Sequence, residues 1–362
     1  MSCEKMKIAF ITRSVGGGGA ERVVSVLANE FSRRVEIDEV SVIAIIEDYV
    51  TYPINSDVIY RANTDKTVAK VKRVYKRYSF LKKCIKELAP DVVISFCTQI
   101  NIYSIFAMRG DRAKLIISER NDPNNDPIQK WVRKFRNIVY PLADGIVLQT
   151  PDAAEYFKNF LKKPSHVIAN PIKENLPNPY NGIREKRIVT VARLSPAKNL
   201  PMLIRAFQAF GIKHLDYKLE IYGEGPLREV LEELIKELDL ESKVYLMGYT
   251  EDLHMKILSA TCFVLASDYE GISNAMLEAL ALGVPTICTD CPIGGSRMFI
   301  NNMNNGILVP VGDQLALEKA LHELVESSSL QKHLSKEAVK IRQELTPEKI
   351  AKQWMDFIGS IV

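Results

Sequence analysis

Short apolar runs alternate with segments of helical periodicity along the first half of the chain. The runs are continuous rather than alternating in polarity, which is typical of strands buried on both faces of a parallel sheet. They lie at 7–12, 40–46, 92–96, 115–118, 145–150 and 166–170. Between several of them, apolar residues recur at the three- and four-residue steps of a helix. This alternation predicts a Rossmann-like domain over residues 1–175.

The same alternation restarts after a segment rich in proline and asparagine, at 170–187, which we interpret as a linker. Further strands are predicted at 187–194, 217–223, 243–248, 262–267 and 285–289. They predict a second Rossmann-like domain over 183–345, and a helix over 346–362, capped by Thr346, that packs back on the first domain. The fold class is therefore α/β with two facing domains. Because parallel sheets bind ligands at the carboxyl ends of their strands, we expect the active site in the interdomain cleft.

The two halves of the chain differ in charge. Residues 1–175 carry 28 Lys and Arg against 20 Asp and Glu, whereas the remainder carries 20 against 24. The first domain is therefore expected to face an anionic partner. We expect no secretory signal at the start of the sequence, and no apolar run reaches the ~18 residues of a membrane span. With six scattered cysteines, of which Cys288 and Cys291 are better read as packed thiols than as zinc ligands, we expect a cytoplasmic protein.

Glycines follow predicted strands in both domains. Those after the first strand open a helix, and they are Gly16, Gly17, Gly18 and Gly19. Backbone N–H groups of such a turn can approach an anion at a helix N-terminus, which predicts a phosphate- or sugar-binding turn; a flexible connector is the alternative. A dinucleotide fingerprint would read GxGxxG, so the plain glycine run disfavours a nicotinamide cofactor. Gly223 follows a strand of the second domain, where an ordinary turn is equally compatible.

Cationic and carboxylate side chains follow other strands of the second domain. Arg193 and Lys198 come after its first strand, where Arg could hold a diphosphate as a fork and Lys as a point charge; solvated loop cations are the alternative. Glu270 precedes and Glu278 lies inside a predicted helix, for which Ser273 is the expected N-cap. We expect Gly283 to end this helix. Because the surrounding helix is almost wholly apolar, Glu278 is expected to be buried and to need a partner; a solvated face is the alternative.

Taken together, these segments resemble glycosyltransferase family 4, the retaining GT-B enzymes, over nearly the whole chain. The motifs are GGGGAERV, ARLSPAKN, YGEGP and EGISNAMLEALALGVP, the last matching a Glu-x7-Glu signature. The resemblance implies that Arg193 and Lys198 bind the donor diphosphate, that Glu278 binds the ribose and that Glu270 contacts the transferred sugar. It implies a donor pocket lined by Gly271, Ile272 and Ser273, onto which the turn of Gly16, Gly17, Gly18 and Gly19 closes. From their positions we also expect the donor to contact Gly223, Asn274 at the start of the helix, and Tyr249, whose segment 247–254 follows a predicted strand and is expected near the base. It also implies front-face transfer without a metal, and no Asp-x-Asp follows a predicted strand.

One position departs from that family. Many members have a histidine after the fourth strand of the first domain, but none of the five histidines lies in the segment 115–126. Glu119 or Arg120 takes its place. We predict that Glu119 acts in catalysis by contacting the donor sugar or the acceptor hydroxyl; capping or salt-bridging within the loop is the equally weighted alternative.

A basic segment in the first domain suggests the acceptor. Residues 66–86 contain nine Lys or Arg and no acid, with apolar residues at helical steps. Such a helix is typical of a membrane-surface or polyanion contact; a solvated helix packed on the sheet is the alternative, and no nucleic-acid motif accompanies it. It is similar to the acceptor-side helix of family members that extend undecaprenyl-pyrophosphate-linked oligosaccharides. The predicted acceptor and membrane residues are Lys66, Lys70, Arg73, Lys76, Arg77, Arg120 and Trp131.

These features predict a retaining hexosyltransferase at the inner face of the plasma membrane. It would move a hexose or N-acetylhexosamine from a nucleotide-sugar, by family analogy a UDP-sugar, to a lipid-linked glycan, without a further cofactor. A two-domain NAD-dependent oxidoreductase is one alternative, and a non-catalytic sugar-binding module is another.

Overall fold

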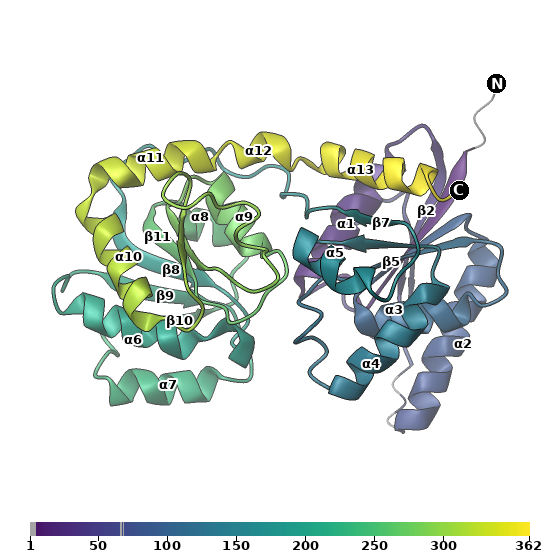
Figure 1. The fold of residues 1–362 in the computed structure, drawn as a ribbon, viewed down its shortest axis with the longest axis horizontal. Helices are drawn as coiled ribbons and strands as arrows, with labels where there is room; N and C mark the ends of the chain where they lie inside the picture. The colour runs from purple at the N-terminus through teal and green to yellow at the C-terminus, as the bar shows by residue number, and fades with distance from the viewer. Residues whose placement is uncertain (1–4, 66, 68) are drawn as a thin grey trace. The chain divides into compact units, whose positions relative to one another are not determined.

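The computed structural model describes residues 5–65, 67 and 69–362, which form two compact units. The first extends to Pro171 and includes Thr346–Val362, and the second is Ile172–Leu345. Each unit contains one parallel sheet with helices packed against it (Figure 1). The predicted α/β class with two Rossmann-like domains is therefore confirmed. The proline-rich segment after Pro171 belongs to the second unit.

The first sheet has seven parallel strands in the order β3-β2-β1-β4-β5-β6-β7. The strands are β1 (Met6–Thr12), β2 (Ile37–Ala44), β3 (Ile59–Ala62), β4 (Val92–Phe96), β5 (Lys114–Ser118), β6 (Gly145–Leu148) and β7 (Ser165–Val167). Strand order reverses between β1 and β4. At such a switch point the connections leave toward opposite sides, which opens a crevice beyond the carboxyl ends.

The helices of the first unit include α1 (Gly19–Ser32), α2 (Lys70–Leu88), α3 (Thr98–Ala107), α4 (Lys130–Val139), the short 3-10 helix η1 (Tyr140–Leu142), α5 (Pro151–Lys158) and α13 (Pro347–Gly359). Helix α13 packs against α1. Its fully buried Trp354 lies 5.7 Å from the ring of Phe96 in β4. As predicted, the Thr346 side chain caps α13, accepting from the Lys349 N–H. Burial of an aromatic pair favours the attachment of this last helix to the first sheet.

The second sheet has six parallel strands in the order β10-β9-β8-β11-β12-β13, and its order reverses between β8 and β11. The strands are β8 (Glu185–Val191), β9 (Lys218–Tyr222), β10 (Val244–Gly248), β11 (Ala260–Leu265), β12 (Thr286–Thr289) and β13 (Ile307–Val309). The helices are η2 (Pro196–Lys198), α6 (Leu200–Gly211), α7 (Arg228–Glu237), α8 (Leu253–Leu258), α9 (Asn274–Ala281), α10 (Gln314–Glu326), α11 (Ser328–Ala338) and α12 (Ile341–Glu344).

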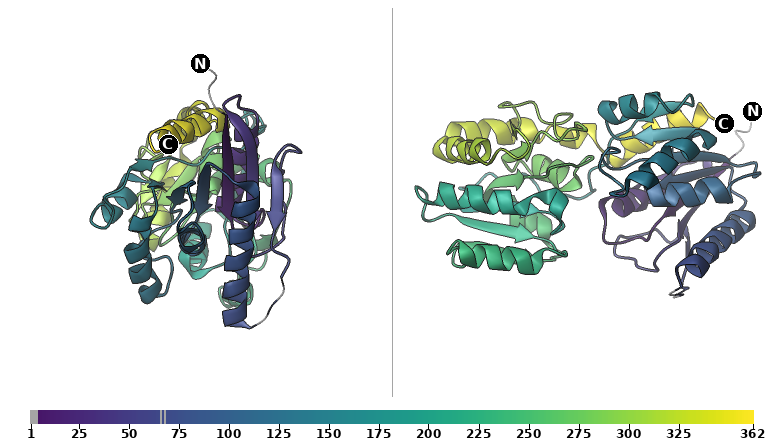
Figure 2. Two further views of the ribbon diagram at one scale, coloured as in Figure 1. Left: turned by 90° about the vertical axis from the view of Figure 1, so that its right-hand side faces the viewer. Right: turned by 60° about the horizontal axis from the view of Figure 1, so that its bottom comes forward.

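Both faces of the second sheet are covered. Side chains of α6, α7 and α10 share one apolar core with β8, β9 and β11, whereas α9 contacts α8, α11 and α12. Figure 2 shows the strands of this unit lying between layers of helices. Such double burial accounts for the continuous apolar runs of the sequence. Among the described helices, none combines the length and the apolar character needed to cross a membrane.

Candidate functional site

The switch point of the second sheet brings two distant loops together. The loop after β8 carries Arg193 and Lys198, and the loop after β11 carries Glu270. Because β8 and β11 are adjacent parallel strands, both loops leave from the same edge of the sheet. This is the edge at which open α/β sheets bind ligands, so the two loops form the candidate donor site.

An ion pair joins the loops. Lys198 Nζ contacts Glu270 Oε2, and both side chains are largely buried. Ser267 Oγ donates to the same carboxylate oxygen at 3.3 Å. Asn199, whose φ of 42° is left-handed, donates through Nδ2 to Asp268 Oδ1 at 2.7 Å. These contacts hold Lys198 and Glu270 in one geometry.

Arg193 is exposed, whereas 17% of the Lys198 side chain is exposed. The backbone adds a further link between the loops, because the Asp268 N–H donates to the Ala197 carbonyl at 2.9 Å. The structure therefore brings Lys198 to Glu270, while the predicted diphosphate contact of Arg193 stays a prediction.

The turn between Glu270 and α9 is closely packed. Gly271, Ile272 and Ser273 are all buried. Ser273 Oγ accepts from the Met276 N–H at 3.4 Å, which confirms it as the N-cap. A β-carbon added at Gly295 would overlap the Gly271 carbonyl, so the backbone after β12 supports this turn directly. Asn274 is the first residue of α9, whose N-terminal end carries the positive partial charge of a helix.

Glu278 is buried, with 3% of its surface exposed, so the solvated-face alternative is wrong. Its Oε2 lies 2.9 Å from Nε2 of His254 in α8. This contact supplies the partner that a buried carboxylate needs. The sequence analysis did not identify His254 as this partner. As predicted, α9 ends before Gly283, whose φ of 68° favours glycine.

The two glycines of the YGEGP turn have a packing role. A β-carbon at Gly223 would meet the carbonyl oxygen of Ala192, and one at Gly225 would lie 2.7 Å from the Leu194 nitrogen. Both glycines therefore let this turn approach the loop that leads to Lys198. Tyr249 follows β10 and is 75% exposed, and its contact with the donor stays a prediction.

The glycine turn of the first unit lies after β1, at the switch point of the first sheet. Gly17 has a φ of 79°, and Gly18 is the N-cap residue of α1, whose first residue is Gly19. A β-carbon at Gly16 would lie 2.7 Å from Thr51 Oγ1, and one at Gly18 would meet the Glu21 carboxylate. Burial raises the pKa of Glu21. A protein carboxylate thus lies at the N-terminus of α1, where the sequence predicts an external anion or sugar.

Glu119 lies inside the first unit with 3% of its surface exposed. Thr98 Oγ1 and Tyr140 Oη each donate to its Oε2 at 2.7 Å, and Arg136 Nη1 lies 3.8 Å from the same oxygen. Burial raises the pKa of Glu119, while Arg136 and the two hydrogen bonds oppose this shift. These contacts agree with the internal salt-bridge alternative. A contact between Glu119 and a sugar stays a prediction.

Arg136, which is fully buried, holds the loop that follows Glu119. Its guanidinium donates to the carbonyls of Pro123 and Asp126, each at 2.9 Å, and lies over the ring of Phe157 at 5.0 Å. A planar guanidinium, whose N–H donors have fixed directions, is suited to donate to several buried carbonyls at once. The positive charge of α4 is therefore partly internal.

Comparisons with known proteins agree with this geometry. The family model of group 1 glycosyl transferases matches residues 174–341, and that of Glycosyltransferase Family 4 matches residues 17–176. Together they cover both units. The chain belongs to glycosyltransferase family 4. Membership of this family does not favour the alternative prediction of a two-domain NAD-dependent oxidoreductase.

Two curated relatives of this glycosyltransferase come from Campylobacter jejuni. One, N-acetylgalactosamine-N,N'-diacetylbacillosaminyl-diphospho-undecaprenol 4-alpha-N-acetylgalactosaminyltransferase, is 29% identical over 97% of this chain and 99% of its own. The other, GalNAc-alpha-(1->4)-GalNAc-alpha-(1->3)-diNAcBac-PP-undecaprenol alpha-1,4-N-acetyl-D-galactosaminyltransferase, is 28% identical over 98% of this chain and 99% of its own.

Among solved structures, Anabaena Alr3699/HepE in complex with UDP and glucose is similar in fold. Its TM-score is 0.82 at 16% identity, with 98% of this chain and all of that chain covered. The likeness shows that the glycosyltransferase has the GT-B fold.

The basic segment of this family 4 glycosyltransferase forms α2, and Lys66 lies outside the described residues. Lys70 is exposed, whereas Arg73 and Arg77 are half-buried. Lys76 Nζ lies 2.6 Å from Asp65 Oδ2, and this contact and Thr67 lower the pKa of Asp65 to about 2.

Arg120 and Trp131 have different surroundings. Arg120 is buried, its Nη1 donates to Ser118 Oγ at 3.3 Å, and its Nη2 contacts Asn170. Burial lowers the pKa of Arg120 to about 10. The charge of Arg120 is therefore enclosed by protein and not presented at a membrane surface, while its contact with the acceptor stays a prediction. Trp131 is 70% exposed, so its side chain is accessible to a partner.

Proposed function

We propose that this glycosyltransferase moves an N-acetylhexosamine or hexose from a UDP-sugar, with retention of configuration, to a polyprenyl-pyrophosphate-linked glycan. The observation that carries the proposal is the Lys198–Glu270 pair at the switch point of the second sheet, next to the buried Glu278. The names of the Campylobacter relatives support a diphospho-undecaprenol acceptor and an N-acetylgalactosaminyl group. The UDP in the Anabaena structure supports the choice of base.

Lys198 and Glu270 divide the donor between them in this proposal. A lysine ammonium has three donors, so Lys198 can contact Glu270 and a phosphate oxygen together. Glu270 is an acceptor for hydroxyls of the transferred sugar. Helix α9 begins shortly after Glu270. Its N-terminal end stabilises the negative charge that develops on the leaving diphosphate. These groups stabilise the departing UDP without requiring a metal in the proposed reaction.

The proposed transfer proceeds on one face of the sugar. The bond between C1 and the UDP oxygen breaks, and the acceptor oxygen bonds to C1 from the same side. The acceptor proton passes to an oxygen of the leaving diphosphate. Neither Glu270 nor Glu278 acts as a general base; both hold the donor, since Glu270 is paired with Lys198 and Glu278 with His254. Positioning of the reacting groups then lowers the barrier.

Exposed apolar and basic side chains on α2 support a membrane-associated acceptor. Val71 is 83% exposed, and Val74 and Tyr75 are also exposed beside Lys70 and Lys72. Helix α3 contacts both α2 and α4, so these three helices pack together in the first unit (Figure 1). An amphipathic basic helix with exposed apolar residues is suited to an anionic bilayer surface. We therefore propose peripheral binding at the inner face of the plasma membrane.

The transfer reaction is tested with a panel of UDP-sugars and a polyprenyl-diphosphate-linked acceptor. UDP release and product formation are measured, and NMR of the product gives the anomeric configuration. We expect Glu270→Gln and Lys198→Gln each to lower turnover by ~10²–10³-fold, as removal of a transition-state contact does. The control is Lys186→Gln, which removes an exposed ion pair with Asp216 at the opposite edge of the sheet. An inverted product, or unchanged turnover in Glu270→Gln, contradicts the proposal.

Membrane binding is tested separately by flotation with vesicles of anionic or neutral lipid. Anionic vesicles are expected to float the protein at low salt, and salt is expected to weaken the binding. Tyr75→Ser with Trp131→Ser is expected to reduce flotation. Equal flotation of neutral and anionic vesicles, or none at low salt, contradicts this part of the proposal and leaves the transfer chemistry untouched.

A further inference from the structure

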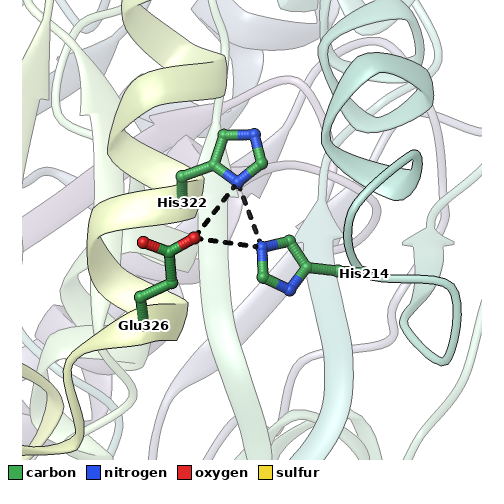
Figure 3. Close-up of side chains that lie close together, drawn as sticks. All are labelled: His214, His322 and Glu326. Atoms are coloured by element: carbon green, nitrogen blue, oxygen red, sulfur yellow. Dashed lines mark hydrogen bonds and ion pairs between the residues drawn. The ribbon is translucent and has the colours of Figure 1, made fainter.

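Two histidines and a glutamate from distant parts of the chain converge in the second unit (Figure 3). His214 lies between α6 and β9, and His322 and Glu326 lie one turn apart on α10. His214 Nε2 is 3.0 Å from His322 Nδ1, and these nitrogens are 3.6 and 3.9 Å from Glu326 Oε1. Three potential metal-ligand atoms therefore face one another.

We propose that these three side chains bind a divalent transition-metal ion, with zinc as the preferred ion. The nearest point that is equidistant from the three atoms lies in their plane, about 2.1 Å from each, which is the length of zinc bonds to imidazole and carboxylate. Two histidines and one glutamate form a ligand set that zinc uses, and the spacing of four residues between His322 and Glu326 places both on one face of α10. A fourth ligand position outside this plane is then open to water, because the Glu326 side chain is 61% exposed.

The surroundings of the two rings favour this role. Glu318 Oε1 lies 3.7 Å from Nε2 of His322, the nitrogen that faces away from His214. A carboxylate on the far side of an imidazole keeps the proton there and leaves the other nitrogen as a ligand. Phe210 is stacked on His214 at 4.5 Å and lies 5.2 Å from His322. Both rings are thus held in place before an ion binds.

Without an ion, the 3.0 Å contact requires one histidine to donate to the other. This gives the alternative, a structural hydrogen-bonded histidine pair. The two differ in what happens to the shared proton, because a metal displaces it and takes both nitrogens as ligands. A metal site therefore predicts that the protein binds the ion tightly, whereas the hydrogen-bonded histidine pair predicts no metal binding.

The topology assigns the ion a structural role. His214 follows the C-terminal end of α6 and precedes β9, so it lies at the amino ends of the strands. Lys198 and Glu270 follow the carboxyl ends of β8 and β11, at the opposite edge. An ion here would join the end of α6 to the end of α10, which is a cross-link within the second unit. It should raise stability and leave the donor site unchanged.

The test uses the full chain, stripped of metal by chelation, and Zn²⁺ alone as the probe. Isothermal titration should give one tight site, and thermal unfolding should move to higher temperature as Zn²⁺ is added. His214→Asn, His322→Asn and Glu326→Gln should each weaken binding by ~10–100-fold. His333→Asn is the matched control, since His333 is an exposed histidine on α11. Affinity for UDP should not depend on Zn²⁺.

Two results overturn the proposal. One is the absence of tight Zn²⁺ binding, which leaves the hydrogen-bonded histidine pair. The other is tight binding that survives in the His214→Asn, His322→Asn double variant, which places the ion elsewhere. Glu326→Gln keeps the test valid if a histidine variant fails to fold, because Glu326 is exposed. Tetrahedral Co²⁺ absorption that is lost in Glu326→Gln would support the proposed ligand set.

Discussion

Replacing Gly295 by alanine tests whether the turn between Glu270 and α9 must keep its position for transfer. A β-carbon at Gly295 would overlap the carbonyl oxygen of Gly271, would lie 2.7 Å from its carbonyl carbon and 3.3 Å from the Ile272 nitrogen. Gly295 does not have the left-handed φ of its neighbour Gly294. The effect of alanine is therefore steric and acts on the Gly271 turn.

The magnitude follows from the separation. A carbon atom in contact with a carbonyl oxygen lies about 3.3 Å from it, whereas the added β-carbon would lie 1.7 Å from the Gly271 oxygen. The two backbones must therefore move apart by roughly 1.5 Å. Such overpacking costs about 1–3 kcal/mol of unfolding free energy, which is ~2–12 °C of unfolding temperature for a unit of this size. A shift of that size in the loop carrying Glu270 is expected to lower turnover by ~100-fold.

The assay is transfer from the best UDP-sugar, with thermal unfolding measured on the same protein. Gly211→Ala is the matched control, because a β-carbon there meets nothing within 4 Å. The control should keep both turnover and stability, whereas Gly295→Ala should lose turnover while still folded at the assay temperature. Unchanged turnover in a folded Gly295→Ala protein would refute the view that this packing positions Glu270.

Three further predictions concern named contacts. His254→Leu removes the side chain that contacts the buried Glu278, so it should lower the free energy of unfolding by about 1–3 kcal/mol and weaken UDP-sugar binding. Urea unfolding and calorimetry measure these two effects, and the absence of a change in either contradicts this prediction. Because burial raises the pKa of Glu119, the folded protein binds this proton more tightly than the unfolded chain, so the free energy of unfolding should fall as pH rises from the unfolded-state pKa through the folded-state pKa. Urea unfolding of Glu119→Gln should lack this pH dependence, and the same pH dependence in the variant and the wild-type protein would count against it. Asp65→Asn releases Lys76 from its ion pair and should strengthen binding to anionic vesicles by up to about 1 kcal/mol; flotation at fixed salt measures it, and weaker binding would contradict the proposed surface.

Local features of the donor site were predictable from the sequence. The Ser273 cap and the Gly283 stop depend on residues within one helix, and both are confirmed. The burial of Glu278 followed from its apolar neighbours in α9. The short strands β3 and β13 were not predicted, because runs of four and three residues carry too little periodicity to separate a strand from a loop.

Contacts between distant segments required the structure. Lys198 and Glu270 are 72 residues apart, and only the strand order that places β8 beside β11 shows that they meet. The partner of Glu278 is on α8, and the partners of Glu119 come from α3, α4 and η1. A single sequence contains no signal that pairs such residues, since each pairing follows from packing of whole elements.

The contacts of Glu270 and Glu278 suit donor binding better than acid–base catalysis in the proposed reaction. Glu270 is an acceptor for Lys198 and Ser267, which both contact its Oε2 atom. Glu278 is similarly engaged by His254. Both acids are therefore suited to orient hydroxyl groups of the proposed donor, and Lys198 is suited to contact its diphosphate. In the proposed reaction, the acceptor hydroxyl supplies its proton to the leaving diphosphate.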